Sequence, residues 1–498
     1  MNFKTRKISS SKISSANDLQ KNEQKPERTN NTPKKIPKLT INLIATALIL
    51  LILVLTVGIY KTLSEIDYSV LLKVAGTKLM EDDHGLTNFM ILGIGGKNHD
   101  GGDLTDTIMI ASLDNKNHHV SMVSIPRDIY LKDATIGNSK INEMYYYAKK
   151  HFDDEKAGLD FFKTKVEELI DTEIHYYILV DFKGFKEIVD IIGGVEVQVE
   201  NDIYDPYYPK DGTYLYETFS IKKGLQSLDG ELALKYARSR KTTSDFDRSF
   251  RQQQIIYAIK EKAMSGDVLF SSEKISEILD SLKSNIFTNI TVGEILTLGA
   301  IAKDYSDKDI THQLLHDDPN FCGGLLYTPP RIEYNNAFVL LPAGGDKYLH
   351  IFFNLLFNFP KAIENTKIHV LNGTATAGVA GETKQILTRY CFDINRFGNG
   401  RSQKVEETTY YYKEKLNEKG EKIDSRPLAL DFLQTIIPGK ETTVIPEEYA
   451  EYMTGTDLIM ELGNDYVSSE NYLKDPFYYL ILYTPTPGEV INSNTTPN

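Results

Sequence analysis

One uninterrupted apolar segment restricts this chain more than any other feature. Residues 41–60, INLIATALILLILVLTVGIY, contain no charged side chain, and Asn42 is the only amide side chain among them. Twenty residues of α-helix rise about 30 Å, which is the thickness of the hydrocarbon core of a bilayer. The segment therefore predicts one transmembrane helix over residues 41–60. The alternative is a buried helix of a soluble domain.

The two flanks of this segment differ sharply in charge. Residues 1–40 carry ten Lys and Arg against three acids, although the whole chain of 498 residues has a net charge of −13. Because the more basic flank of a span stays in the cytoplasm, we expect a single-pass protein of the cell membrane. Its N-terminus would be cytoplasmic and its C-terminal domains extracytoplasmic. Residues 1–40 are also polar and poor in apolar residues, which predicts a disordered basic tail.

Beyond the span, short apolar runs alternate with helical patterns. Residues 61–85 have apolar residues at a spacing of three to four, which predicts a helical stalk. Bounded apolar runs predict strands at 88–93, 107–113, 119–125, 176–180 and 195–199. Helical periodicity predicts helices at 141–150, 158–171, 182–192, 230–239 and 250–263, then over much of 270–315 and near 346–357.

This alternation indicates the α/β class, with a layered domain over residues 86–355. The strand–turn–helix pattern restarts at residue 366, which predicts a smaller C-terminal α/β domain over 366–468. Residues 469–498 are rich in Pro, Thr and Asn and are expected to form a loose tail. Cys322 and Cys391 match no metal-binding spacing; they are either a disulfide outside the cell or two buried thiols.

The stretch 236–254, YARSRKTTSDFDRSFRQQQ, is the strongest functional signal. It concentrates four arginines and two aspartates in an otherwise acidic chain: Arg238, Arg240, Arg248, Arg251, Asp245 and Asp247. Guanidinium groups match phosphate oxygens bidentately, so the stretch predicts a site for a phosphorylated ligand. A salt-bridged helix face is the alternative. The acidic balance of the exterior part argues against nucleic acid as the partner.

Two further segments bear on these arginines. Arg127 follows a predicted strand, which is where α/β folds place ligand groups, and Lys140 adds a second cation. The glycine-rich stretch 93–107 carries one imidazole and three carboxylates, on His99, Asp100, Asp103 and Asp106. Such ligands suit Mg²⁺ or Mn²⁺ at a phosphate. A flexible hairpin loop with solvated acids is the alternative.

Several short motifs follow one another over residues 88–254: LTDT (104–107), SIPRD (124–128), KIN (140–142), DF-KGF (181–185), GGVEV (193–197), LDGELALKYARSR (228–240) and DFDRSFRQQ (245–253). In this order they resemble the LytR–CpsA–Psr (LCP) family. Residues 366–465, with VLNGTATAGVAG and DLIMELGNDY, resemble the LytR C-terminal domain.

The resemblance implies a layered domain with a central mixed sheet flanked by helices. It also implies a membrane-anchored phosphotransferase. Such a protein moves a phosphorylated glycopolymer, for example teichoic acid or capsule, from a polyprenyl diphosphate carrier to cell-wall peptidoglycan. Its partners are the lipid-linked polymer, the peptidoglycan acceptor and membrane lipid. The implied catalytic residues are Asp106, Arg127, Arg238, Arg240, Asp245 and Arg248, with Lys140, Arg251 and Gln252 as substrate-binding residues. Asp106 would hold Mg²⁺.

One position departs from the family pattern. Many members have an aspartate after the first strand that helps to hold the metal, whereas this chain has Gly95. We therefore expect the following loop to supply a ligand, with Asp103 as the first candidate and His99 and Asp100 behind it.

Two other functions use the same residues. A polyprenyl diphosphate hydrolase would have water as its acceptor, and a non-catalytic protein would only bind polyprenyl phosphates or wall polymer.

Overall fold

The computed structural model describes residues 77–97, 99, 101–210, 215–239, 245–263, 265, 277, 286–302, 305–364, 366–416, 422–423, 425–470 and 472–477. The predicted basic tail, the predicted transmembrane helix at 41–60, residues 61–76 of the predicted stalk, and residues 478–498 lie outside the described residues. In the part of the chain that is described, no helix is both long and apolar enough to cross a bilayer.

The last part of the predicted stalk is not helical. Residues 77–86 contain no helix, so the stalk helix predicted over 61–85 is wrong for residues 77–85. The Asp82 carboxylate accepts hydrogen bonds from the backbone N–H groups of His84 and Leu86, at 2.9 Å each. An aspartate that bonds to the backbone just after it favours a turn over a helix.

A six-stranded mixed sheet forms the centre of the larger domain. Its order is β11-β6-β1-β2-β3-β12. The strands are β1 (Thr87–Ile94), β2 (Thr105–Asp114), β3 (His119–Ser124), β6 (Tyr176–Asp181), β11 (Ile286–Thr288) and β12 (Ile310–Leu314). β1 runs parallel to β6 and antiparallel to β2, and β12 runs parallel to β3. The sheet confirms the predicted α/β class with a central mixed sheet.

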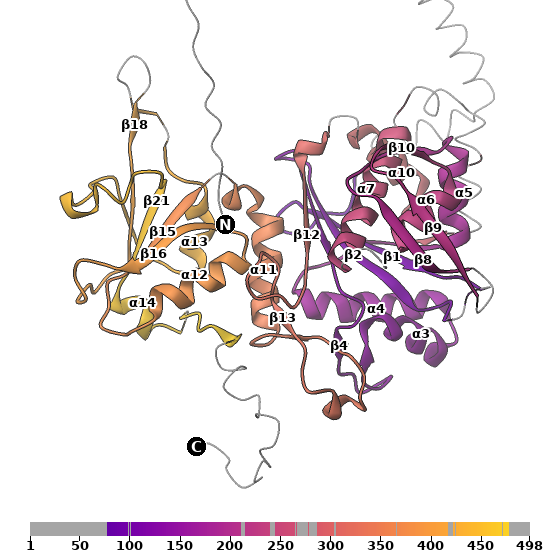
Figure 1. Cartoon of the computed structure of the whole chain (residues 1–498), viewed down its shortest axis with the longest axis horizontal. Helices are drawn as coiled ribbons and strands as arrows, with labels where there is room; N and C mark the ends of the chain where they lie inside the picture. Colours follow the sequence, from indigo (N-terminus) through magenta and orange to yellow (C-terminus); the bar gives the residue numbers. More distant parts are fainter. Residues whose placement is uncertain are drawn as a thin grey trace, which may run out of the picture. The chain divides into compact units, whose positions relative to one another are not determined.

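Helices cover both faces of this sheet (Figure 1). Successive side chains of a strand point to opposite faces. Met90 and Leu92 of β1 therefore join a core with α3 (Ile141–Phe152), α4 (Glu155–Ile170) and α11 (Asp346–Asn358). Phe89, from the same strand, packs in a second core with α7 (Asp245–Ala263) and α10 (Val292–Ala302). The result is a three-layered α/β/α arrangement, in which the predicted helices near 141–150, 158–171, 250–263 and 346–357 are confirmed.

Aspartates begin two helices that lead to the site. Asp181 accepts a hydrogen bond from the Gly184 N–H at 2.7 Å and caps α5 (Phe182–Ile191). Asp229 accepts one from the Leu232 N–H at 2.8 Å and caps α6 (Gly230–Arg238). These caps satisfy N–H groups that the first turn of a helix leaves without partners. A Cβ on Gly230 would lie 2.3 Å from the Lys186 carbonyl oxygen, so only glycine allows α5 and α6 to approach this closely.

Two parts of the larger domain differ from the sequence-based prediction. Residues 310–314, predicted as helical, form strand β12, because they pair with β3 about 190 residues earlier in the chain. The prediction also missed a hairpin of β8 (Ile203–Pro209) and β9 (Tyr216–Ile221), and β10 (Gly224–Leu228), which pairs with β7 (Val195–Val199). The short pairs β4 (Tyr130–Leu131) with β5 (Ser139–Lys140), and β13 (Leu326–Tyr327) with β14 (Leu341–Pro342), complete the domain.

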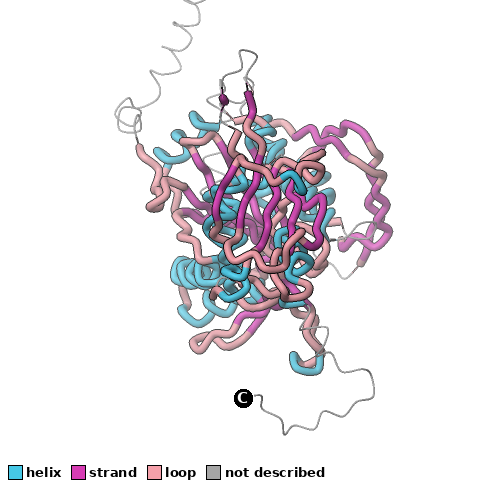
Figure 2. Tube along the Cα trace, turned by 90° about the vertical axis from the view of Figure 1, so that its left-hand side faces the viewer, coloured by secondary structure: helices cyan, strands magenta, loops and turns pink. Residues whose placement is uncertain are grey.

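A second, five-stranded sheet follows in the order β16-β15-β21-β17-β20. Its strands are β15 (Lys367–Asn372), β16 (Asp393–Asn399), β17 (Thr409–Tyr412), β20 (Lys440–Thr442) and β21 (Leu458–Leu462). Helices α12 (Val379–Arg389) and α13 (Ala429–Ile436) contribute apolar residues to its core. Strands are magenta and helices cyan in Figure 2. This is the smaller α/β part predicted from residue 366, and it belongs to one compact unit with the larger sheet.

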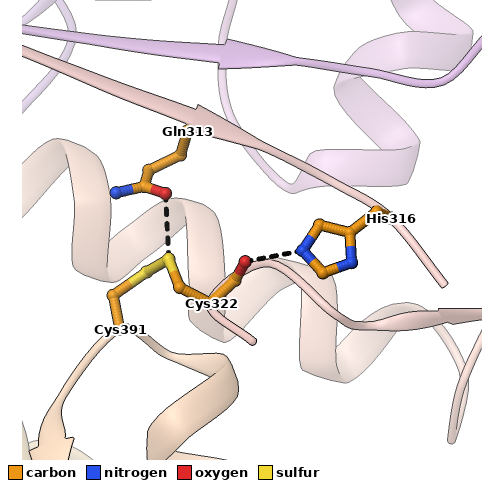
Figure 3. Close-up of a disulfide and its surroundings, with 4 residues drawn as sticks. All are labelled: Gln313, His316, Cys322 and Cys391. Atoms are coloured by element: carbon orange, nitrogen blue, oxygen red, sulfur yellow. Dashed lines mark hydrogen bonds between the residues drawn. A yellow bond between two sulfur atoms is a disulfide. The ribbon is translucent and has the colours of Figure 1, made fainter. Parts of the chain in front are cut away.

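A disulfide joins the two parts (Figure 3). Cys322 follows β12 and Cys391 follows α12, and their sulfur atoms are bonded. Of the two alternatives that the sequence left open, the structure has the disulfide. His316 donates from Nε2 to the Cys322 carbonyl oxygen at 2.8 Å, and the Gln313 side-chain amide contacts the Cys322 Sγ at 2.9 Å.

A buried ion pair lies close to the disulfide. Arg389, only 3% exposed, donates to both carboxylate oxygens of Asp475, at 2.7 and 3.1 Å. Its Nε also donates to the Pro319 carbonyl oxygen at 2.8 Å, and its own carbonyl oxygen accepts from the Gly323 N–H at 2.8 Å. Arg389 therefore ties α12 to the segment that carries Cys322 and to the last described residues.

We expect loss of the disulfide to destabilise the fold. The bond closes a loop with a sequence separation of 69 residues, and cross-links of this kind typically contribute about 2–4 kcal/mol. The double variant Cys322→Ser/Cys391→Ser should lower the free energy of unfolding by this amount in urea titration. The wild type under reducing conditions serves as the control and should show a similar loss. Equal stability of all three forms would contradict the expectation.

Candidate active site

Strand direction brings the predicted residues to one edge of the larger sheet. β1 is parallel to β6, and β3, which is antiparallel to β2, runs in the same direction as β1. The carboxyl ends of β1, β3 and β6 therefore meet at one edge, as do the ligand-holding ends of other α/β sheets. The loop 95–104 follows β1, Arg127 follows β3, and Phe182 follows β6.

The loop that carries Arg127 is fixed by the backbone. The Ile125 N–H donates to the Ile108 carbonyl oxygen at 2.8 Å, and the Leu340 N–H donates to the Asp128 carbonyl oxygen at 2.9 Å. On the other side, the N–H of Asn142, from the KIN motif, donates to the Arg127 carbonyl oxygen at 3.3 Å. The SIPRD and KIN motifs thus meet in space, and Arg127 projects from a constrained turn.

Four charged side chains form a chain of ion pairs at this turn. Arg127 Nη1 lies 2.5 Å from Asp106 Oδ1, and its Nε lies 3.6 Å from Asp128 Oδ2. Lys140 Nζ donates to the other oxygen of Asp128 at 2.6 Å. The side chains of Arg127 and Asp106 are 28% and 38% exposed, so a ligand can reach them. The structure therefore brings together three predicted residues, Asp106, Arg127 and Lys140.

Aromatic rings orient Arg238, the last residue of α6. Its guanidinium carbon lies 4.0 Å from the centre of the Phe182 ring and 5.5 Å from that of Tyr208. Its Nη2 lies 3.1 Å from Nε2 of His99. Because a guanidinium only donates, His99 accepts through Nε2. Phe182 and Tyr208 were not predicted as site residues, although Phe182 belongs to the DF-KGF motif.

His99 occupies the space left by the glycine at position 95. A Cβ on Gly95 would lie 2.7 Å from Cγ of the imidazole, so no side chain at position 95 is compatible with this position of His99. The rings of His99 and Phe182 also pack nearly perpendicular to each other, with ring centres 5.2 Å apart. The imidazole of His99 therefore lies against Gly95 and contacts the guanidinium of Arg238.

Arg251 connects helix α7 to the end of helix α6 through hydrogen bonds to the backbone. Only 4% of it is exposed, and it donates from Nε to the Tyr236 carbonyl oxygen at 2.9 Å and from Nη2 to the Ser239 carbonyl oxygen. It thereby ties α7 to the end of α6, next to Arg238. Burial raises the pKa of the Tyr236 hydroxyl to about 12, so this hydroxyl stays protonated and donates to Gln254 at 2.7 Å.

Gln253 was not predicted as a site residue, but it helps to position α7. Gln253 is buried, and its amide nitrogen lies 3.3 Å from Ser124 Oγ at the end of β3 and 3.4 Å from the Gln313 carbonyl oxygen in β12. It therefore attaches α7 to the strand end that leads to Arg127. Gln252, the predicted substrate-binding residue, is half-buried in the same helix.

The remaining predicted residues are only partly described. Arg240 lies outside the described residues. Asp245 and Arg248 belong to α7, but their side chains are outside the description. The roles predicted for these three residues stay predictions.

The predicted metal ligands do not form one group. Asp106 pairs with Arg127, Asp103 lies 3.2 Å from Nζ of Lys149, and His99 contacts Arg238. Across the described ranges, three or more His, Cys, Asp or Glu side chains that could share a metal ion do not come together. Asp100, the remaining candidate ligand, lies outside the described residues, and the magnesium site stays a prediction.

We expect Arg251→Ala to destabilise the protein strongly. The substitution leaves two buried carbonyl oxygens without their charged donor, at a cost of about 2–4 kcal/mol. Gln252→Ala, the adjacent half-buried position, should change stability by only about 0.5 kcal/mol. Urea unfolding of the two variants measures the difference. A loss of the same size in both would mean that the hydrogen bonds of Arg251 do not hold α6 and α7 together.

Comparison with known proteins places the chain in a family. The model of the LytR_cpsA_psr family matches residues 54–336, and that of the LytR cell envelope-related transcriptional attenuator domain matches residues 365–466. Over 235 residues the chain is 33% identical to the polyisoprenyl-teichoic acid–peptidoglycan teichoic acid transferase TagV of Bacillus subtilis (strain 168). This alignment covers 46% of the chain and 54% of that relative, or about half the length of each.

Two further comparisons cover similar parts of the chain. It is 32% identical over 244 residues to the transferase TagU of Bacillus cereus (strain AH820), which covers 48% of the chain and 72% of TagU. The crystal structure of B. subtilis TagV superposes on the chain with a TM-score of 0.42 and 28% identity. This superposition covers 54% of the chain and 96% of the TagV chain in the crystal. The first family model matches more than half of the residues of this chain, so the chain belongs to the LytR_cpsA_psr family.

Proposed function

We propose that this protein transfers a phosphorylated glycopolymer from a polyprenyl diphosphate carrier to cell-wall peptidoglycan. Two relatives are named as teichoic acid transferases that use a polyisoprenyl-linked donor and peptidoglycan. One observation in this chain supports the proposal above the others. Arg127 and Arg238, which are 111 positions apart in the sequence, are held by specific contacts at the same edge of one sheet.

The transfer exchanges one P–O bond for another. An acceptor hydroxyl on peptidoglycan attacks the phosphorus that carries the polymer, and the bond from that phosphorus to the bridging oxygen breaks. Polyprenyl monophosphate leaves with the bridging oxygen and its electron pair, and the hydroxyl proton passes to a carboxylate. Such reactions need positioning and charge neutralisation more than covalent help from the protein.

The arginines would supply that neutralisation. Arg127 is held between Asp106 and Asp128, so a bound diphosphate competes with these carboxylates for its N–H donors. Arg238 stacks on Phe182, and stacking keeps the N–H donors of a guanidinium in a fixed plane. Fixed donors stabilise charge that develops on phosphate oxygens without reorganising during the reaction. In the proposal, Arg240 and Arg248 complete this clamp, and Asp245 orients an arginine or accepts the hydroxyl proton.

The proposal includes a membrane anchor. A polyprenyl carrier stays in the bilayer, so the enzyme must work at the membrane surface. The apolar segment 41–60 and the basic residues before it support a single span with the catalytic part outside the cytoplasm.

We expect product formation only when the acceptor is present. The full-length protein, in detergent with Mg²⁺, would be incubated with a polyprenyl diphosphate-linked oligosaccharide, with and without peptidoglycan glycan. Arg127→Ala and Arg238→Ala should each lower kcat/KM by about 10²–10³-fold, the effect of removing a donor to the transition state. Arg331→Ala, an exposed arginine that packs against Phe338, serves as the control and should retain activity.

The same assay separates the other functions. Oligosaccharide phosphate released without glycan would identify a hydrolase, and binding without any product would identify a binding protein. Either result would overturn the proposed transfer.

Magnesium binding is a separate part of the proposal. With Mg²⁺ titrated into the full-length protein, Asp106→Ala should weaken binding most. Asp103→Ala should also weaken it, since both carboxylates must leave a cation to bind the metal, Asp106 from Arg127 and Asp103 from Lys149. Unchanged affinity in Asp103→Ala would remove this residue from the metal site, and unchanged affinity in both variants would remove the proposed site altogether.

A further inference from the structure

A cavity with both apolar and charged lining residues opens next to the candidate active site. Its volume is about 500 Å³, which lies within the range of about 300–1,000 Å³ that small-molecule sites occupy. One wall comes from the loop after β1 and the other from α3. The loop contributes Lys97, His99, Asp103 and Leu104, and α3 contributes Tyr146 and Lys149.

The walls combine apolar and charged side chains, as a site for a sugar ring requires. Leu104 and the ring of Tyr146 contribute apolar surface. Tyr146 is 38% exposed and presents an aromatic ring on α3. Lys97, Lys149 and Asp103 place hydrogen-bond donors and acceptors around the same space. An aromatic ring that packs on C–H groups, beside charged groups that bond to hydroxyls, matches the amphipathic faces of a pyranose.

The shape of the loop wall is constrained. The Gly96 N–H donates to the Gly102 carbonyl oxygen at 2.9 Å, which closes the loop on itself. A Cβ on Gly102 would lie 2.1 Å from the Gly96 carbonyl oxygen, and Gly96 has a φ of +83°. Side chains at these positions would therefore break the loop. On the other wall, Lys149 lies 3.2 Å from Asp103, so this ion pair joins α3 to the loop.

The cavity is joined to the proposed phosphate clamp through His99. This residue lines the cavity and also accepts a hydrogen bond from Arg238 at 3.1 Å. A group bound in the cavity is therefore adjacent to a phosphate bound by Arg238.

We propose that this cavity binds a saccharide unit of the reacting glycan, either the sugar attached to the diphosphate of the donor or the sugar that carries the acceptor hydroxyl. The inference rests on the proposed function and adds to it a recognition site for the glycan. Tyr146 stacks on the ring, Lys149 and Asp103 bond to its polar substituents, and His99 separates the sugar from the phosphate.

Neighbouring residues on α3 supply matched controls. Tyr146 and Lys149 are three residues apart and share a face of the helix that lines the cavity. Tyr147 and Lys150 have the same chemistry and spacing, are exposed, and do not line it. Thermal unfolding of all four alanine variants, whose side chains are partly or fully exposed, should show that each remains folded.

Binding is measured by titration of the full-length protein with three probes. These are a polyprenyl diphosphate without sugar, the same lipid carrying an N-acetylhexosamine disaccharide, and a soluble peptidoglycan fragment. Tyr146→Ala and Lys149→Ala should weaken binding of a saccharide-bearing probe by about tenfold, which corresponds to about 1.4 kcal/mol. Both should bind the sugar-free lipid like the wild type. Tyr147→Ala and Lys150→Ala should bind all three probes within about twofold of the wild type.

The pattern of losses identifies the sugar. A loss confined to the lipid-linked disaccharide assigns the cavity to the donor, and a loss confined to the peptidoglycan fragment assigns it to the acceptor; both results support the proposal. Unchanged binding of both saccharide probes, or an equal loss for the sugar-free lipid, overturns it. Failure of the proposed function is a different result: the wild type would then form no transfer product, whatever the cavity variants bind.

Discussion

The shared direction of β1, β3 and β6 is the constraint on which the candidate site depends. The functional residues come from loops and helix ends distributed over residues 95–251, and only the common carboxyl edge of these strands gathers them. β2 runs against its neighbours and therefore begins at that edge, where Asp106 meets Arg127. A strand shifted by one residue would turn these side chains toward the opposite face.

Much of this arrangement could be predicted from the sequence. The apolar runs of β1 and β2 and the periodicity of α3 and α4 are local signals, and the structure has strands and helices there. Aspartate caps and the SIPRD and KIN motifs also belong to short segments. Residue type and position along the chain already related Arg127, Lys140 and the loop with Asp106 to the arginines, and the family resemblance implied their roles.

Features that depend on distant partners could not be predicted. Residues 310–314 form a strand only because β3 lies beside them, and a local reading favoured a helix. The position of His99 over Gly95 depends on the fold of the loop, which spacing does not reveal. The same holds for the ring contacts of Arg238, since Phe182 and Tyr208 come from different elements of the domain. The pairing of Cys322 with Cys391 depends on how the two sheets meet.

The disulfide also determines how the molecule would transmit mechanical force. When the two ends of a chain are pulled apart, the tension follows its covalent backbone. Between Cys322 and Cys391 the covalent bond provides the shorter path, so tension bypasses α11, β15 and α12. These elements are enclosed in a loop that carries no load. The first strand of the second sheet and the helix that packs against it can thus keep their contacts while the chain on either side is stretched.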